Sequence, residues 1–174
     1  METEANIVQG AVTVLGSFVS ADVILPARHS FLKPRDMIEH VLEEVSAEVN
    51  ASVCSCPIIV AGEGFGYGTG RESPARALSA AGIKAIIGGP FARMFFRNAI
   101  NNGVLVLDCP AIVSSGITTG DDVEIDAASG SVRWKGYEFA AVPVPEFILA
   151  IVSAGSLIEH GRRTVQRMGG TLPI

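Results

Sequence analysis

Apolar residues along the chain fall into short, unbroken runs that alternate with segments of helical spacing. The runs after residue 56 are mostly aliphatic, as is typical of strands buried on both faces of a parallel sheet. Strand and helix alternate regularly, which predicts βαβ units. The predicted strands cover residues 7–15, 57–61, 83–87 and 104–107, and the predicted helices cover residues 34–49, 72–82 and 91–101.

The pattern changes after Pro110, where short alternating segments flank an Ala-Ser-Gly turn and predict an antiparallel hairpin. Two helical patterns separated by Gly155 close the chain. We therefore expect one α/β domain over residues 1–174 with a mostly parallel central sheet, an antiparallel hairpin and closing helices. Residues 156–174 would form a helical tail. Strands are predicted at 123–126, 131–134 and 137–142, and helices at 145–154 and 157–168.

The composition argues against a disordered, a membrane-spanning, a secreted and a nucleic-acid-binding protein. Hydrophobic residues make up 48% of the chain and charged residues only 18%, which argues against disorder. No apolar run is long enough to cross a bilayer, and the N-terminus lacks the basic and apolar regions of a secretion signal. We therefore expect a cytoplasmic, soluble protein. The net charge of −5, with no basic face, argues against nucleic acid as a partner.

The three cysteines fit a reducing compartment better than a disulfide framework. Cys54 and Cys56 are too closely spaced for the usual C-x-x-C pair, and no histidine cluster accompanies them in the sequence. Three cysteines with this spacing cannot complete a four-thiolate cage. We expect this chain to bind no metal and no cofactor of its own.

The most informative feature is the glycine-rich loop at residues 62–71, which follows a predicted buried strand and leads into a predicted helix. Five of its residues are glycines, and these allow the backbone to come close to a ligand. A helix N-terminus favours an anion. Thr69 adds a hydroxyl, and Arg71 adds a fork suited to a carboxylate. The loop therefore predicts a pocket for a small carboxylate or phosphate.

Other glycine-loop sites fit this sequence less well. A dinucleotide site requires G-x-G-x-x-G and an acidic residue after the next strand, but that strand ends in Gly88-Gly89. A P-loop requires Gly-Lys-Ser/Thr, which does not follow here. A turn without a binding role stays open as an interpretation, although it would not require an arginine immediately inside the helix.

Four blocks of the sequence together resemble the small-subunit family of the 3-isopropylmalate dehydratases, which belongs to the aconitase superfamily. They occur in that family's order and spacing, within a resemblance that extends from about Ile7 to Leu157. The blocks are VAGEGFGYGTGRE at 60–72, AGIKAII at 81–87, FARMFFRNAI at 91–100 and NGVL at 102–105.

The resemblance implies a swivelling β/β/α domain that closes over a [4Fe–4S] cluster held by a separate large subunit. It implies a hydro-lyase that isomerises a hydroxylated di- or tricarboxylate by dehydration and rehydration, with 3-isopropylmalate in leucine biosynthesis as the default substrate. In such enzymes the cluster iron acts as a Lewis acid, and a hydroxyl from the glycine loop takes the substrate proton.

Motif matching carries the family's site residues onto this chain. The family's Gly-Ser-Ser-Arg-Glu corresponds to residues 68–72, which read Gly-Thr-Gly-Arg-Glu. Thr69 then takes the place of the base serine and Arg71 that of the carboxylate-binding arginine, with Gly68 and Gly70 beside the substrate. Gly70 lacks the family's second hydroxyl. Asp22 matches an aspartate that orients a histidine of the large subunit.

Residues 28–33 lie where the family discriminates between substrates, and Arg28 and His29 are the candidates there for substrate binding. The segment contains both basic and apolar residues, so it selects neither a distal carboxylate nor an alkyl group. Three alternatives stay open: a divergent relative that acts on another substituted malate or a homoaconitate-like acid, a non-catalytic carboxylate-binding module, and a free-standing phosphate-binding domain.

Overall fold

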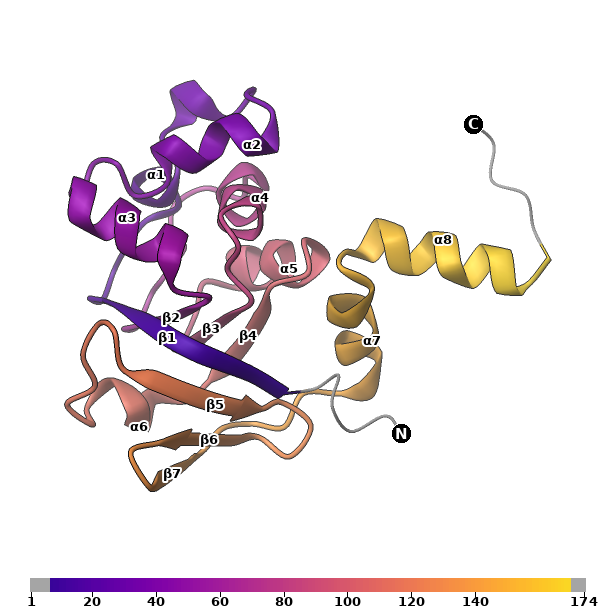
Figure 1. Ribbon diagram of the computed structural model, residues 1–174. Coiled ribbons are helices and arrows are strands. Elements are labelled where there is room, and N and C mark those ends of the chain that lie inside the picture. The colour runs from indigo at the N-terminus through magenta and orange to yellow at the C-terminus, as the bar shows by residue number, and fades with distance from the viewer. Residues whose placement is uncertain (1–6, 170–174) are drawn as a thin grey trace.

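A seven-stranded sheet with the order β4-β3-β2-β1-β5-β6-β7 forms the centre of the computed structural model, which describes residues 7–169 (Figure 1). One half of the sheet is parallel and the other half is antiparallel, as the sequence predicts. The parallel strands are β1 (Ile7–Leu15), β2 (Ile58–Ala61), β3 (Ala85–Gly88) and β4 (Leu105–Asp108). The antiparallel strands, which continue from β1, are β5 (Asp122–Asp126), β6 (Ser131–Trp134) and β7 (Tyr137–Ala140).

Alternate side chains of the parallel strands enter two separate hydrophobic cores. Ile59 and Ile86 face a core shared with the helices, whereas Ile58 and Ile87 face a core shared with β5 and β6. The order of layers is therefore helix, parallel sheet, antiparallel sheet, which confirms the predicted β/β/α arrangement. The helices of the first layer are α1 (Ala21–Ile24), α2 (Pro34–Met37), α3 (Ala47–Ser55), α4 (Ser73–Ala80) and α5 (Arg93–Asn101) (Figure 1).

The predicted helix at 34–49 is wrong, because the chain breaks it into α2, the short 3-10 helix η3 (Ile38–His40), a turn and α3. Leu42 takes a φ of 54°, and its backbone N–H donates to the carbonyl of Ile24 in the buried core. The Asn50 side chain satisfies two carbonyls of the broken helix, and Ser46 caps α3. Tertiary hydrogen bonds therefore override the helical periodicity at 34–49.

The C-terminal part contains the two predicted helices, α7 (Glu146–Ala154) and α8 (Leu157–Arg167). Gly155 ends α7 in the left-handed conformation, and α8 points away from the rest of the fold (Figure 1). A one-turn helix, α6 (Pro110–Val113), was not predicted. Among residues 7–169, no helix combines the length and the apolar character that a membrane span requires.

Candidate functional site

The glycine loop is held in place by a second segment, residues 16–21, which runs beside it between β1 and α1. Three backbone hydrogen bonds of 2.7–2.8 Å join the two segments, and Ser20 and Tyr67 form an isolated parallel bridge. The bridge places the start of α1 next to the end of the loop. The bonds run from Phe18 N to Glu63 O (2.7 Å), from Gly66 N to Val19 O (2.8 Å) and from Ala21 N to Tyr67 O (2.8 Å).

The middle of the loop packs on an aromatic pair. Phe65 is fully buried and contacts Phe95 edge-to-face, with ring centroids 5.2 Å apart. Gly66 has a φ of +80°, and a Cβ added there would lie 2.2 Å from the Phe95 ring. This glycine is therefore required both by its backbone conformation and by the close approach of α5.

We expect Gly66→Ala to lower the free energy of unfolding by about 2–4 kcal/mol, because it combines a left-handed alanine with overpacking against Phe95. Gly161→Ala is the matched control, since a Cβ there meets no atom within 4 Å and the residue lies inside α8. This control should be neutral or stabilising by up to about 1 kcal/mol. Urea unfolding of both variants measures the difference, and equal stabilities would contradict the packing argument.

The Arg71 side chain connects the loop to the first helical segments. Its Nε donates to Thr69 Oγ1 at 3.1 Å and its Nη1 donates to Ser30 Oγ at 2.6 Å. Its Nη2 forms an ion pair with the Asp22 carboxylate. The structure thus brings three of the proposed site residues, Asp22, Thr69 and Arg71, together and adds Ser30 to the group. Three of the five guanidinium N–H groups have partners within residues 7–169.

Thr69 Oγ1 accepts a second hydrogen bond, from the backbone N–H of Arg71 at 3.0 Å. Two N–H donors, one of them cationic, therefore point at this oxygen. Donors directed at an oxygen favour its charged form. The geometry is suited to a hydroxyl that takes up a proton from a bound molecule.

The backbone around Thr69 is open on one side and held on the other. A Cβ on Gly68 would meet no atom within 4 Å, so this glycine leaves space beside the hydroxyl. Asn98 of α5 donates to the carbonyls of Gly70 and Arg71 at 3.2 and 3.1 Å. The loop end is therefore fixed to α5 while its other side stays accessible.

Positive charge exceeds negative charge around Ser30. Arg76 of α4 donates to the Ser30 carbonyl at 3.4 Å, its buried Nε has no hydrogen-bond partner within the described chain, and the buried Ser73 hydroxyl donates to Ser30 Oγ. The carboxylate of Asp22 is exposed. Sequence reasoning missed Ser30, Ser73 and Arg76, although Ser73 and Arg76 are three residues apart on one helix face.

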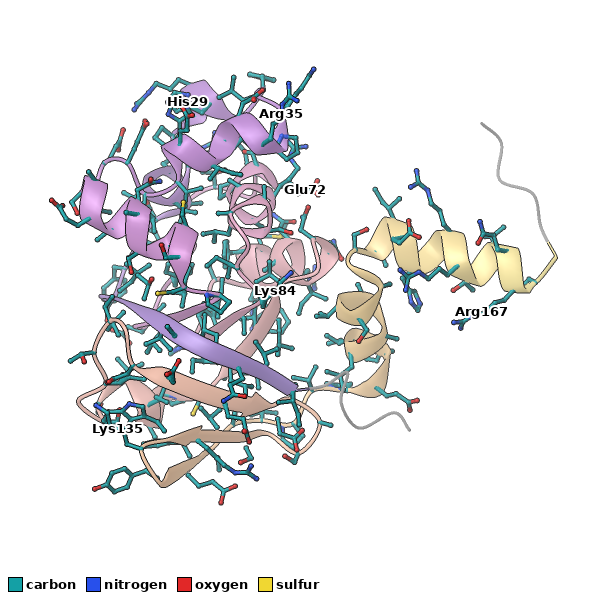
Figure 2. All side chains as sticks on the ribbon, in the orientation of Figure 1. His29, Arg35, Glu72, Lys84, Lys135 and Arg167 are labelled. Atoms are coloured by element: carbon teal, nitrogen blue, oxygen red, sulfur yellow. The ribbon has the colours of Figure 1, made fainter. Side chains whose placement is uncertain are left out.

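The side chains of Arg28 and His29 do not join the Arg71 group. Arg28 pairs with Glu43 and with Glu44, at 3.0 Å to the latter, and His29 lies 3.0 Å from Glu43. His29 lies at the outer end of the helical layer (Figure 2). The hydrogen bond from His40, with those from Arg28 and His29, lowers the pKa of Glu43. Through the backbone, His29 is adjacent to Ser30.

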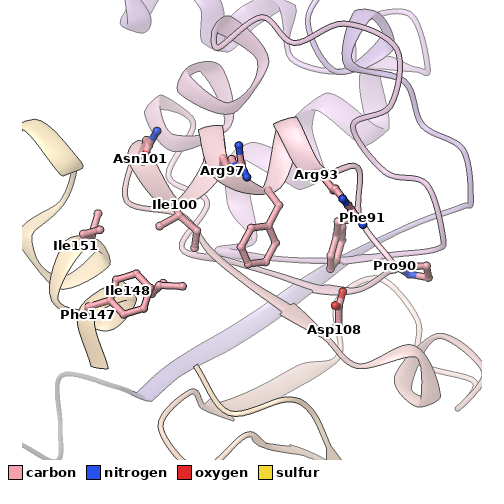
Figure 3. A pocket seen from close by; sticks show the side chains of 11 residues that line it. Pro90, Phe91, Arg93, Arg97, Ile100, Asn101, Asp108, Phe147, Ile148 and Ile151 are labelled. Atoms are coloured by element: carbon pink, nitrogen blue, oxygen red, sulfur yellow. The ribbon is translucent and has the colours of Figure 1, made fainter. Parts of the chain in front are cut away.

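A cavity of about 630 Å³ lies elsewhere, between α5 and α7 (Figure 3). Arg93 and Arg97, which the sequence predicts on one face of α5 as solvated or interfacial residues, both line it. Phe147 of α7 lies on the opposite wall and is 67% exposed. No residue of the Asp22, Thr69 and Arg71 group belongs to this cavity.

Comparisons with known proteins show that the chain is similar to small subunits of dehydratases. The family model of the aconitase C-terminal domain matches residues 36–111. A 3-isopropylmalate dehydratase small subunit of Caldanaerobacter subterraneus is 42% identical over 91% of this chain and 99% of its own. A 2,3-dimethylmalate dehydratase small subunit of Eubacterium barkeri is 39% identical over 87% and 94%. The crystal structure of 3-isopropylmalate dehydratase from Methanocaldococcus jannaschii superposes with a TM-score of 0.81, at 30% identity over 94% and 99% of the two chains.

Proposed function

Because this chain belongs to the aconitase-type family of small dehydratase subunits, we propose that it is the small subunit of a heteromeric hydro-lyase that isomerises 3-isopropylmalate in leucine biosynthesis. All 174 residues would act as one swivelling domain, with residues 156–174 as its tail. The observation that carries the proposal is the Thr69 oxygen, which receives two N–H donors of Arg71 beside an open stretch of loop.

In this proposal Thr69 and Arg71 divide the work on the substrate. Thr69 Oγ1, as the alkoxide that its two N–H donors favour, takes the proton from the carbon next to a carboxylate. The hydroxyl on the neighbouring carbon takes a proton from an acidic group of the large subunit and departs as water, which leaves an alkene. Water then adds to the alkene with its hydroxyl on the carbon that lost the proton and its hydrogen on the neighbouring carbon, which gives the isomer. Arg71 binds a carboxylate with the N–H groups that its own partners leave, aided by the positive charge of Arg76.

Asp22 has two proposed tasks that are compatible. Its ion pair with Arg71 orients the guanidinium when no substrate is bound, and its exposed carboxylate can orient a histidine of the large subunit, as the family resemblance implies. Arg28 and His29 would act on the substrate through the loop that they anchor, since their side chains are engaged by Glu43.

The [4Fe–4S] cluster of this enzyme class would belong to the large subunit. The thiols of this chain do not fit one, because Cys56 and Cys109 are buried and belong to different parts of the fold. Burial also raises the pKa of the Cys109 thiol, which disfavours the thiolate that a cluster binds. The free state of all three cysteines supports a cytoplasmic location.

A second candidate substrate of the same class is 2,3-dimethylmalate, because the Eubacterium barkeri relative is named a 2,3-dimethylmalate dehydratase small subunit. Thr69 and Gly70 both differ from the serine pair that the resemblance implies. A malate with another alkyl substitution would use the same proton and carboxylate chemistry and would differ only at the alkyl contacts.

Reconstitution tests the proposal. The full chain is mixed anaerobically with a large subunit of this dehydratase family and with iron and sulfide, and the absorbance of the alkene is followed with 3-isopropylmalate and with 2,3-dimethylmalate. Turnover of the first substrate supports the default, and turnover of the second alone identifies the divergent relative. A loaded complex that turns over neither substrate but retains carboxylate binding would overturn the enzymatic proposal in favour of a binding module.

Restoring the second hydroxyl of the loop should improve substrate binding. Gly70 has an ordinary φ, and a Cβ there would meet only Met94, at 3.6 Å, so Gly70→Ser fits without strain. One added hydrogen bond is worth about 0.5–1.5 kcal/mol, which lowers KM by up to roughly tenfold. Gly68→Ser is the matched control, because its φ of +105° strains any side chain. An unchanged KM for Gly70→Ser would place the substrate away from this residue.

A further inference from the structure

Two histidines and a glutamate meet in the helical layer, at whose outer end His29 lies (Figure 2). His29 ends the 3-10 helix η2 (Ala27–His29) and His40 ends η3. Their rings stack with centroids 3.6 Å apart and planes within 3° of parallel. Both rings direct a nitrogen at the Glu43 carboxylate, His29 Nε2 at 3.0 Å and His40 Nδ1 at 2.6 Å.

From this juxtaposition we propose that His29, His40 and Glu43 form a binding site for a divalent transition-metal ion, of which Zn²⁺ is the best match. Two imidazoles and one carboxylate are a known zinc ligand set that leaves a fourth position for water. Imidazole nitrogens also select zinc, copper or nickel over magnesium or calcium. The proposed metal site does not rest on the proposed enzymatic function.

The distances are close to those that a zinc ion requires. One ligand atom from each residue lies within 4.8 Å of the other two. Zinc–ligand bonds of about 2.0–2.2 Å place tetrahedral ligands about 3.4 Å apart. The largest separation must therefore shorten by at most about 1.4 Å, and rotation of side chains that are 18–28% exposed can supply this movement. Stacking already holds the two rings together.

Arg28 is the group that opposes a cation here, because it pairs with Glu43. It has a second partner in Glu44, at 3.0 Å, and its side chain is 58% exposed. Arg28 can therefore move to Glu44 alone when an ion takes Glu43.

An ion at this site would fasten η2 to the end of η3. Ser30 follows His29 directly and accepts hydrogen bonds from Arg71 and Ser73. Zinc would thus fix the backbone of a residue that touches Arg71 without contacting Arg71 itself, as a structural clamp on residues 27–30.

Titration of the tag-free full chain with zinc chloride, followed by calorimetry, tests the site. We expect one Zn²⁺ per chain. Loss of an outer-shell partner weakens metal binding by about 10–100-fold, so His29→Gln, His40→Gln and Glu43→Gln should each weaken it by at least as much. Saturating Zn²⁺ should raise the melting temperature of the wild type and not of His29→Gln. Retained melting transitions show that the variants fold.

The chain offers matched controls. His160→Gln removes the third histidine of the sequence, and Cys54→Ser removes an exposed thiol, so both should bind Zn²⁺ like the wild type. Arg28→Gln keeps all three ligands and removes the competing cation, so it should bind several-fold more tightly. The proposal is overturned if no saturable binding occurs, if binding survives His29→Gln and His40→Gln, if it is lost in Cys54→Ser, or if Arg28→Gln fails to strengthen it.

Discussion

Thr69→Ala is expected to lower kcat of the reconstituted complex by about 10²–10⁴-fold, the usual contribution of a positioned proton-transfer group. The reason is the pair of N–H donors that Arg71 directs at the Thr69 oxygen, because this pair favours the oxygen as a proton acceptor. Rates with saturating 3-isopropylmalate, followed through the alkene absorbance, measure the effect.

Three further variants separate a base from a binding group. Thr69→Val keeps the shape and the branched side chain and should be as inactive as Thr69→Ala, whereas Thr69→Ser retains the oxygen and should stay active. Thr164→Ala removes an exposed hydroxyl of α8 and should change neither constant. If Thr69→Ala raises KM and leaves kcat intact, the hydroxyl only binds substrate, and another group must take the proton.

The sheet could be predicted from sequence because its central strands are buried on both faces. Runs such as Ile58–Ala61 have no polar position that would allow another interpretation, and the glycine loop between β2 and α4 cannot be a regular element. Because nearly every residue in these runs is buried, the sequence alone predicts both the strands and their parallel sheet, without knowledge of which strands pair.

The region between β1 and β2 shows what periodicity cannot decide. Residues 38–45 have helical spacing, but Val41 and Leu42 are fully buried in extended and left-handed conformations. The backbone hydrogen bond from Leu42 to Ile24 and the side-chain hydrogen bonds of Asn50 join residues that are distant in sequence. No local sequence pattern predicts them. Helix propensity differs by only about 1 kcal/mol among such residues and is overruled by contacts of this kind.

In the candidate site, too, some residues could be predicted from the sequence and others are shown only by the folded chain. The nearness of Thr69 and Arg71 was predictable because both lie on the glycine loop, which is local in sequence. Asp22 was assigned from the family resemblance, and no local pattern indicates its ion pair with Arg71. Ser30 lies 41 residues from Arg71, and only the folded chain shows that it is the residue where Arg71, Ser73 and Arg76 meet. The engagement of Arg28 and His29 by Glu43 likewise depends on the broken helix.

Arg71→Gln is expected to lower kcat/KM by roughly 30-fold or more, since removal of one partner from a hydrogen-bonded charge pair costs about 2–5 kcal/mol. The guanidinium has three simultaneous tasks, at Thr69, Ser30 and Asp22, and a neutral amide cannot reproduce them. Arg71→Lys keeps the charge but not the fork, so it should recover little of the activity. Arg133→Gln on β6, an arginine in surface ion pairs, is the matched control and should behave like the wild type.

A double-mutant cycle with Asp22 decides whether the ion pair serves catalysis only through Arg71. If Asp22 does no more than orient the guanidinium, Asp22→Asn lowers kcat/KM in the wild type and has no further effect in Arg71→Gln, because the group that it positions is already absent. If Asp22 also orients a histidine of the large subunit, its loss lowers kcat in both backgrounds. Independent effects whose free energies add would show that Asp22 contributes by a route that does not pass through Arg71. The exposure of the Asp22 carboxylate, at 56%, leaves it accessible to a second subunit, so we expect a partial coupling, with part of the loss persisting in Arg71→Gln.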